Sequence, residues 1–316
     1  KSEWAFDEAG FESDIMDGLT GDGVKVCIVD TGIDLSHPAF KNTNVMFKDM
    51  ISNSNSPLDY GATAHGTLMA GILVSQDHQF GVSPNVDLGV VAALSDDGNG
   101  MNTADEQKIS DAIEWCIDDF SADIISLSLG GTQSESMTRE GPSVSSVRKA
   151  LDRGIFVVAA AGNDGGSGDD GRVSVPSNVP LVISVGAASQ GGAVWENSSK
   201  GSQMTISGEQ RVHPNMKPEI IAPGVSIVST GSGGQWYSSS GTSDSTVFVT
   251  GALALILQAQ PQLRPSSTLG STCIGEVKQA LRVSASNSIL EHDDLLGYGN
   301  LDAGSWLEEV RSMPNC

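Results

Sequence analysis

The sequence predicts an α/β protein arranged as a three-layer sandwich, with a mostly parallel central sheet and helices on both faces. Short, almost continuous apolar runs alternate with segments in which apolar residues recur every three or four positions. The first pattern is typical of strands buried on both faces, and the second of helices packed against them. Because strand and helix also alternate in order, the strands should be joined by right-handed crossovers.

Five apolar runs are predicted as buried strands, at residues 24–29, 86–94, 122–129, 154–161 and 180–188. Helical spacing of apolar residues predicts a helix over 109–120, and a second helix begins at Pro142 and ends before Gly154. Apolar stretches after His65 and after Ser243 predict two further helices, the second of them long.

We expect a single domain over residues 1–316, because no repeat or low-complexity linker divides the chain. Residues 1–20 are predicted to be a lead-in packed on the surface, and residues 264–275 a loop insertion before the final helices. No apolar run approaches the roughly 20 residues that span a membrane. The polar first residues also lack the basic and apolar zones of a signal peptide.

The net charge is −22, from 39 acidic and 17 basic side chains. Such a surface repels nucleic acid, so nucleic acid is not an expected partner. The repulsion between its own charges is screened at high salt, where the Debye length falls to about 3 Å at 1 M. The charge therefore favours a halophilic source, such as a halophilic archaeon. The alternative is an ordinary acidic protein whose charge serves solubility.

Four cysteines lie at positions 27, 116, 273 and 316, with no Cys-x-x-Cys pair and no histidine at zinc-site spacing. A structural zinc site is therefore not expected. Cys27 lies in an apolar run and Cys116 in a helical pattern, so both are interpreted as small buried hydrophobic residues. Cys273 and Cys316 are candidates for a disulfide.

Asp30 follows the first apolar run and precedes Thr31 and Gly32. This places a carboxylate at the carboxyl end of a strand, where open α/β sheets build their sites. Asp-Thr-Gly after an apolar run also occurs in aspartic peptidases, which need two carboxylates sharing a proton. The chain has no second such motif, so that interpretation requires a homodimer.

Three further residues have an ordinary structural interpretation beside a functional one. His65 precedes a helix, where a lone histidine is usually structural. Ser243 begins a long helix after a Gly-rich loop and is by default an N-cap, although its N–H would also face a developing oxyanion. Asn163 ends an apolar run and is by default a turn residue. The other histidines (His37, His78, His213 and His292) are interpreted as surface or loop residues.

Taken together, the motifs VDTGID, HGT, SLSLGG, AAAGN, APGVSI and GTS, in this order, resemble the subtilisin-like serine peptidases, the subtilase family. The chain order Asp, His, Ser is also that of this family. The resemblance extends over residues 21–302 and implies a serine endopeptidase that acts through an acyl-enzyme. It makes Ser243 the nucleophile, His65 the general base and acid, and Asp30 the group that orients His65. Asn163 and the Ser243 N–H would form the oxyanion hole.

The same resemblance implies a peptide or protein substrate that binds by strand addition. One backbone edge would be Ser128, Leu129 and Gly130, and the other Gly98, Asn99 and Gly100. Ala160, Ala161 and Gly162 would wall the pocket for the residue preceding the cleaved bond, with Ser174 toward its base. Because Asp96, Asp97 and Asp164 flank this cleft, we expect cleavage after large hydrophobic or basic residues and poor cleavage after acidic ones.

The sequence departs from the family pattern at Asp244 and Val247, which stand where the family has Met and Pro. Asp244 puts a charge beside the nucleophile, and Val247 removes a proline that fixes the first helical turn. No cofactor is expected to be required and no metal ligand is assigned. The loop that supplies a calcium site in related peptidases is shortened, and a cluster at Asp164, Asp169 and Asp170 is interpreted as a solvated acidic loop rather than a calcium site.

Three functions are compatible with these residues: an active endopeptidase, a precursor-processing peptidase or peptide ligase of the same fold, and an inactive binding module. The presence of all the catalytic groups favours the first. On family grounds we expect a cleaved or deleted propeptide and a secreted, extracellular protein, although intracellular members of the family exist. Membrane association is not expected.

Overall fold

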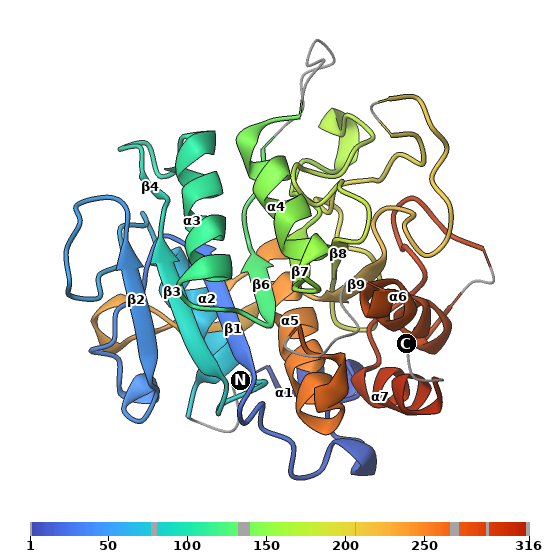
Figure 1. Cartoon of the computed structure of the whole chain (residues 1–316), viewed down its shortest axis with the longest axis horizontal. Helices are drawn as coiled ribbons and strands as arrows, with labels where there is room; N and C mark the ends of the chain where they lie inside the picture. The colour runs from blue at the N-terminus through green and yellow to red at the C-terminus, as the bar shows by residue number, and fades with distance from the viewer. Residues whose placement is uncertain are drawn as a thin grey trace.

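Parallel strands form the central sheet of the computed structural model, which describes residues 2–76, 81–131, 140–205, 207–265, 272–288 and 291–313. Seven strands in this part of the chain pair in the order β2-β3-β1-β6-β7-β8-β9 (Figure 1). They are β1 (Lys25–Asp30), β2 (Val45–Asp49), β3 (Asp87–Ala92), β6 (Ile124–Leu127), β7 (Phe156–Ala160), β8 (Ile183–Ala188) and β9 (Ile220–Pro223). Two small antiparallel pairs lie outside the sheet, β4 (Ser95–Asp96) with β5 (Asn102–Thr103), and β10 (Ile227–Thr230) with β11 (Trp236–Ser239).

Helices cover both faces of the sheet, as predicted (Figure 1). On one face, α3 packs against α4, and on the other α5 runs beneath β6 to β9 with α2 beside it. The long helices are α2 (His65–Val74), α3 (Glu106–Asp118), α4 (Pro142–Asp152), α5 (Thr242–Ala259), α6 (Thr272–Ser284) and α7 (Ala303–Ser312), and the short α1 spans Glu3–Glu8. None of the described helices is long and apolar enough to cross a membrane.

The five predicted strands are confirmed as β1, β3, β6, β7 and β8. β1 has the predicted length and begins one residue later, and the other four are shorter than their apolar runs. The sequence missed β2 and β9. β2 lies at the edge of the sheet and only Asp49 in it is fully buried, so its hydrophobic signal is weak. β9 is four residues long and ends at Pro223, which interrupts strand patterns.

The topology determines where a site can form. β1 has β3 on one side and β6 on the other, so the connections that follow β1 and β6 leave in opposite directions. In open parallel sheets, this arrangement opens a crevice beyond the carboxyl ends of the two strands. Asp30 ends β1 and Ser128 follows β6, at this crevice.

Two segments differ from their predicted character. The lead-in over residues 1–20 is partly core, because Ala5, Ala9 and Met16 are buried and the Phe6 ring packs edge-on against Phe248, with centroids 5.6 Å apart. The predicted loop over 264–275 is wrong at its end, because α6 begins at Thr272. Residues 266–271 lie outside the described part.

The interpretation of Cys27 and Cys116 as unpaired hydrophobic residues is wrong. Both are fully buried, but they form a disulfide that joins β1 to α3, with the Cα atoms 5.8 Å apart. The two cysteines are 89 residues apart in the sequence, so the bond links two elements that are distant along the chain. The described residues contain no free cysteine, and Cys316, the predicted partner of Cys273, lies outside them.

Candidate active site

A carboxylate and an imidazole meet at the carboxyl end of β1. Asp30 is the last residue of the strand, and His65 is the first residue of α2. His65 Nδ1 lies 2.7 Å from Asp30 Oδ1, which also accepts a hydrogen bond of 2.7 Å from the Thr31 N–H. Asp30 is 1% exposed, whereas the His65 side chain is 24% exposed. The ring is therefore anchored through Nδ1, which leaves Nε2 for a reacting group.

Two glycines and an aspartate set this geometry. A Cβ on Gly66 would lie 2.1 Å from the carbonyl O of Gly32, so the start of α2 and the loop after β1 can meet only with glycine there. Asp59 accepts hydrogen bonds from the Thr31 hydroxyl at 2.7 Å and the Thr67 hydroxyl at 2.6 Å, and so ties the two segments together. Sequence reasoning missed Asp59, because a single aspartate in a polar loop gives no signal.

Ser243 is the second residue of α5 and lies beside the end of β6. Its hydroxyl donates to the Ser128 carbonyl O at 3.2 Å, and the Ser128 hydroxyl donates to the Ser243 carbonyl O at 3.0 Å. Within the described ranges, no hydrogen bond joins Ser243 to His65. Catalytic hydrogen bonds often form only when substrate is bound, and a rotation about one side-chain bond would free the Ser243 hydroxyl from Ser128.

Two N–H donors converge near the nucleophile. Asn163 is exposed, and its Oδ1 accepts hydrogen bonds of 2.9 Å from both the N–H and the hydroxyl of Thr242, which leaves the Nδ2 group unused. The Ser243 N–H lies in the first turn of α5, where it has no intrahelical acceptor. A Cβ on Gly241 would lie 3.5 Å from Asn163 Nδ2 and 3.7 Å from Ser243 N. Both donors therefore border the same small space, as an oxyanion hole requires.

The predicted walls of the pocket for the residue preceding the cleaved bond lie together. A Cβ on Gly130 would lie 2.5 Å from Ser174 Cβ, and one on Gly162 would lie 2.5 Å from Ser174 Oγ. The Ala161 carbonyl O accepts a hydrogen bond of 2.6 Å from the Ser174 N–H. Ala160 and Ala161 are buried at the end of β7. The structure thus brings these residues to the edge of the crevice.

The second predicted substrate edge has a different character. Gly98, Asn99 and Gly100 form the exposed tip of the β4–β5 hairpin. Asp96 Oδ1 accepts hydrogen bonds from the N–H groups of Gly98 at 2.9 Å and Gly100 at 3.1 Å, and Asp97 accepts one from Asn99 at 2.8 Å. The N–H groups of this edge are therefore occupied, and only its carbonyl groups can pair with a peptide.

Buried carboxylates shift the pKa of His65. Burial by itself would lower this pKa, but the charge and hydrogen bond of Asp30, together with the charges of Asp244 and Asp59, raise it to about 9. Asp244 is 2% exposed and accepts a hydrogen bond from the Ser239 hydroxyl. Burial raises the pKa of Asp244 to about 6, against the lowering effects of Ser239 and His65. The residue after the nucleophile therefore belongs to the electrostatics of the site.

Asp164, Asp169 and Asp170 carry the carboxylates of the predicted acidic loop. Each of the three carboxylates accepts hydrogen bonds from nearby N–H or hydroxyl groups. Among the residues that the structure describes, no group of three or more His, Cys, Asp or Glu side chains is placed to hold a metal ion.

Of the remaining histidines, His37, His213 and His292 lie in the described part of the chain, and His37 is not a surface residue. It is 1% exposed, its Nε2 lies 3.1 Å from the Gln235 carbonyl O, and its ring packs edge-on against Trp236. His213 and His292 both pack against the Tyr298 ring. His78 lies outside the described residues.

Known proteins with similar sequences include serine proteases. Residues 21–299 match the model of the subtilase family. Subtilisin amylosacchariticus of Bacillus subtilis subsp. amylosacchariticus is 36% identical over 248 residues, which cover 77% of this chain and 58% of that protein. Serine protease AprX of Bacillus subtilis (strain 168) is 33% identical over 311 residues, which cover 90% of this chain and 66% of that protein. The chain thus spans less than two thirds of the length of these relatives.

Solved structures share the fold. The protease domain of PatA superposes with a TM-score of 0.73 and 26% identity, over 95% of this chain and 100% of that one. The prenylagaramide maturation protease PagA superposes with a TM-score of 0.70 and 24% identity, over 91% of this chain and 94% of that one. At that identity, PagA supports the fold alone.

Proposed function

This chain belongs to the subtilase family, and we propose that it is a serine endopeptidase that cleaves peptide bonds through an acyl-enzyme. The observation that carries the proposal is the 2.7 Å hydrogen bond between His65 Nδ1 and Asp30 Oδ1. The bond lies at the same edge of the sheet as Ser243 and Asn163. A serine hydroxyl is a poor nucleophile until a positioned base removes its proton, and His65 is such a base.

In the proposed mechanism, the Ser243 hydroxyl turns toward His65, and its Oγ attacks the carbonyl carbon of the peptide bond as His65 Nε2 takes the proton. Asp30 stabilises the imidazolium that results. The Ser243 N–H and Asn163 Nδ2 bind the oxyanion of the tetrahedral intermediate. The C–N bond then breaks, and His65 gives its proton to the leaving amine. Water then attacks the acyl carbon as His65 Nε2 takes its proton. The bond to Ser243 Oγ breaks, and His65 returns the proton to the Ser243 hydroxyl.

We propose that the substrate is an extended peptide that pairs with Ser128–Gly130 and places the residue before the cleaved bond between Ala160–Gly162 and Ser174. This pocket suits a large apolar side chain. The charges of Asp96, Asp97 and Asp164 favour basic over acidic residues there, and this preference should weaken as salt screens it.

The net charge of −22 supports a salt-rich working environment, a halophilic source and a protein that avoids nucleic acid. An extracellular location, activity without a cofactor and a propeptide removed before activity are proposals that rest on the family alone. We also propose that calcium is not required.

Labelling with a serine-directed fluorophosphonate tests the proposal. We expect label on the wild type and none on Ser243→Ala. The same substitution should lower peptide hydrolysis by about 10⁶-fold, the loss typical of a removed serine nucleophile, without lowering the melting temperature. An unlabelled wild type would indicate an inactive binding module. Transfer of the acyl group to added peptide amines in preference to water would indicate a ligase.

A further inference from the structure

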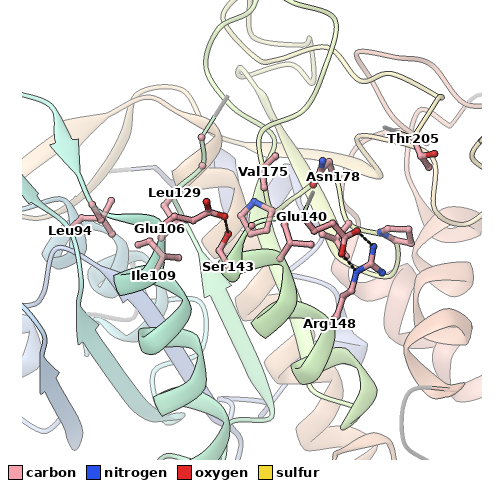
Figure 2. A pocket seen from close by; sticks show the side chains of 18 of the residues that line it. Leu94, Glu106, Ile109, Leu129, Glu140, Ser143, Arg148, Val175, Asn178 and Thr205 are labelled. Carbon is pink, nitrogen blue, oxygen red and sulfur yellow. Dashed lines mark hydrogen bonds and ion pairs between the residues drawn. The ribbon is translucent and has the colours of Figure 1, made fainter. Parts of the chain in front are cut away.

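A cavity of about 980 Å³ extends from the proposed peptide site across the ends of α3 and α4 (Figure 2). It begins at Leu129, next to the Ser128 that touches Ser243, and its near end is apolar, with Leu94 and Ile109 beside Leu129. The far end is formed partly by Thr205, Ser207, Glu209 and Arg211, and Thr205 lies opposite Leu94 in the view of Figure 2. In that view Val175, Glu140 and Arg148 lie between the two ends, so a peptide that leaves the apolar end passes them before it reaches the far end.

The far end is lined by charged side chains, most of which already have partners. Arg148 and Glu140 form a two-bond ion pair through the guanidinium Nε and Nη2 (Figure 2). Glu106 lies nearer the apolar end, beside Leu129 and Ile109 in Figure 2, and accepts a hydrogen bond of 2.9 Å from the Ser143 hydroxyl. The ion pair balances its own charges, whereas Glu106 keeps its negative charge.

Arg211 is the buried charged residue among those that line the cavity. It is 9% exposed, and its guanidinium makes one hydrogen bond, from Nε to the Ser202 carbonyl O at 3.1 Å. Nη1 is buried and has no hydrogen-bond partner in the described part of the chain. No carboxylate there lies within ion-pair distance of Arg211. Glu209 lines the same end of the cavity, but its side chain is exposed and forms no ion pair with Arg211 in the described residues.

The carboxylate behind Arg211 is shared with other basic residues. Glu219 acts on Arg211 through its charge, but Lys217 Nζ and Lys278 Nζ already bind its Oε1 at 2.8 Å and 2.7 Å. Arg211 therefore competes with two closer basic side chains for one carboxylate. A buried charge without a partner is costly, so an anion that enters the cavity and reaches Arg211 gains an unusually strong partner.

We propose that Arg211 forms a subsite for a carboxylate side chain of the substrate, on the amino-terminal side of the cleaved bond. Gly130 lines the cavity and also lies beside Ser174 in the pocket for the residue before the cleaved bond. The cavity therefore lies on the amino-terminal side of that bond. The inference rests on the proposed peptidase function. The subsite makes an acidic residue favourable far from the cleaved bond, although the acidic rim of the cleft disfavours one next to it.

The test is a scan of fluorogenic peptides in which glutamate replaces glutamine at one position after another before the cleaved bond. We expect one position at which glutamate raises kcat/KM by about 10-fold or more, the effect of one charge-assisted hydrogen bond. The preference should vanish in Arg211→Gln and persist in the matched control Arg148→Gln, whose guanidinium is already paired. Unchanged kcat/KM for the glutamine peptide shows that Arg211→Gln is folded.

If Arg211→Gln does not fold, Glu209→Gln is the second variant. Removing this carboxylate from the same end of the cavity should increase the preference for glutamate, and an unchanged or smaller preference would overturn the subsite. So would equal rates for glutamate and glutamine at every position in the wild type, or a preference that survives Arg211→Gln. A wild type that cleaves none of the peptides would instead overturn the proposed function.

Discussion

Two regions of the molecule have opposite balances of charge. One is the edge of the sheet where Asp30, His65, Asn163 and Ser243 lie, called the catalytic edge because these residues are proposed to act in catalysis. The other is the buried cluster of Lys217, Glu219, Lys278 and Arg211 next to β9. At the catalytic edge, His65 is surrounded by the carboxylates of Asp30, Asp244 and Asp59. In the cluster, the basic residues Lys217, Lys278 and Arg211 surround the single carboxylate of Glu219.

Burial by itself lowers the pKa of a base in both regions, yet the outcomes differ. Neighbouring carboxylates raise the pKa of His65 to about 9. For Lys217, burial lowers the pKa well below its usual value, and Lys278 and Arg211 add to this against the pull of Glu219. The comparison shows that several neighbouring carboxylates outweigh burial at His65, whereas burial prevails at Lys217, which shares one carboxylate with other basic residues.

The largest effect on stability is expected when the basic cluster loses its carboxylate. Glu219→Gln leaves two buried lysines without a carboxylate and should lower the free energy of unfolding by about 3–5 kcal/mol, as when one partner of a buried pair is removed. Urea unfolding measures the loss. The control is Glu114→Gln, which removes a partly exposed partner of Lys149 and should cost less than about 1 kcal/mol. Equal losses in the two variants would contradict the importance of the cluster.

At the catalytic edge, Asn163→Ala removes a donor without touching the charges. We expect turnover to fall by about 100- to 1000-fold, as for the loss of one oxyanion-hole donor. The free energy of unfolding should fall by about 1–2 kcal/mol, because Asn163 Oδ1 also accepts hydrogen bonds from the N–H and the hydroxyl of Thr242. Steady-state kinetics and a thermal melt distinguish the two effects. A loss of only threefold in turnover would remove Asn163 from the oxyanion hole.

The excess of carboxylates around His65 should appear in the pH profile of kcat/KM. The base must be neutral to act, so kcat/KM should rise as the pH passes through about 9, the pKa of His65. Protonated His65 also stabilises the fold below its unfolded pKa of about 6.5, and this contribution is lost as the pH rises through about 9. Asp244→Asn should move this rise in kcat/KM to lower pH, by up to about one unit.

The control for this shift is Asp96→Asn at the exposed hairpin, which is not among the charges acting on His65. Its profile should match the wild type. An Asp244→Asn profile that also matches the wild type would show that Asp244 does not act on His65.

Salt should have the smallest effect and should affect the surface rather than either buried region. With a charge of −22, the melting temperature should be higher in 2 M than in 0.05 M KCl, because salt screens repulsion between exposed carboxylates. Equal melting temperatures would count heavily against halophilic adaptation.

The sequence by itself determined the fold class and five strands of the sheet, and it predicted the residues that are proposed to act in catalysis. Asp30, His65, Asn163 and Ser243 each end or follow a buried strand or begin a helix, and the carboxyl ends of parallel strands converge on one edge. Local pattern is enough for such positions, because periodicity and capping are properties of neighbouring residues.

Only the tertiary structure decided which distant side chains meet. It paired Cys27 with Cys116, placed Asp59 between the segments of Asp30 and His65, and buried Asp244 against Ser239. It also left Nη1 of Arg211 without a hydrogen-bond partner in the part of the chain that the structure describes. Periodicity shows which face of an element is buried, but the partner across that face depends on how elements far apart in the chain pack together. A buried charge is therefore visible in the sequence only as a polar residue, and its neighbours decide what it does.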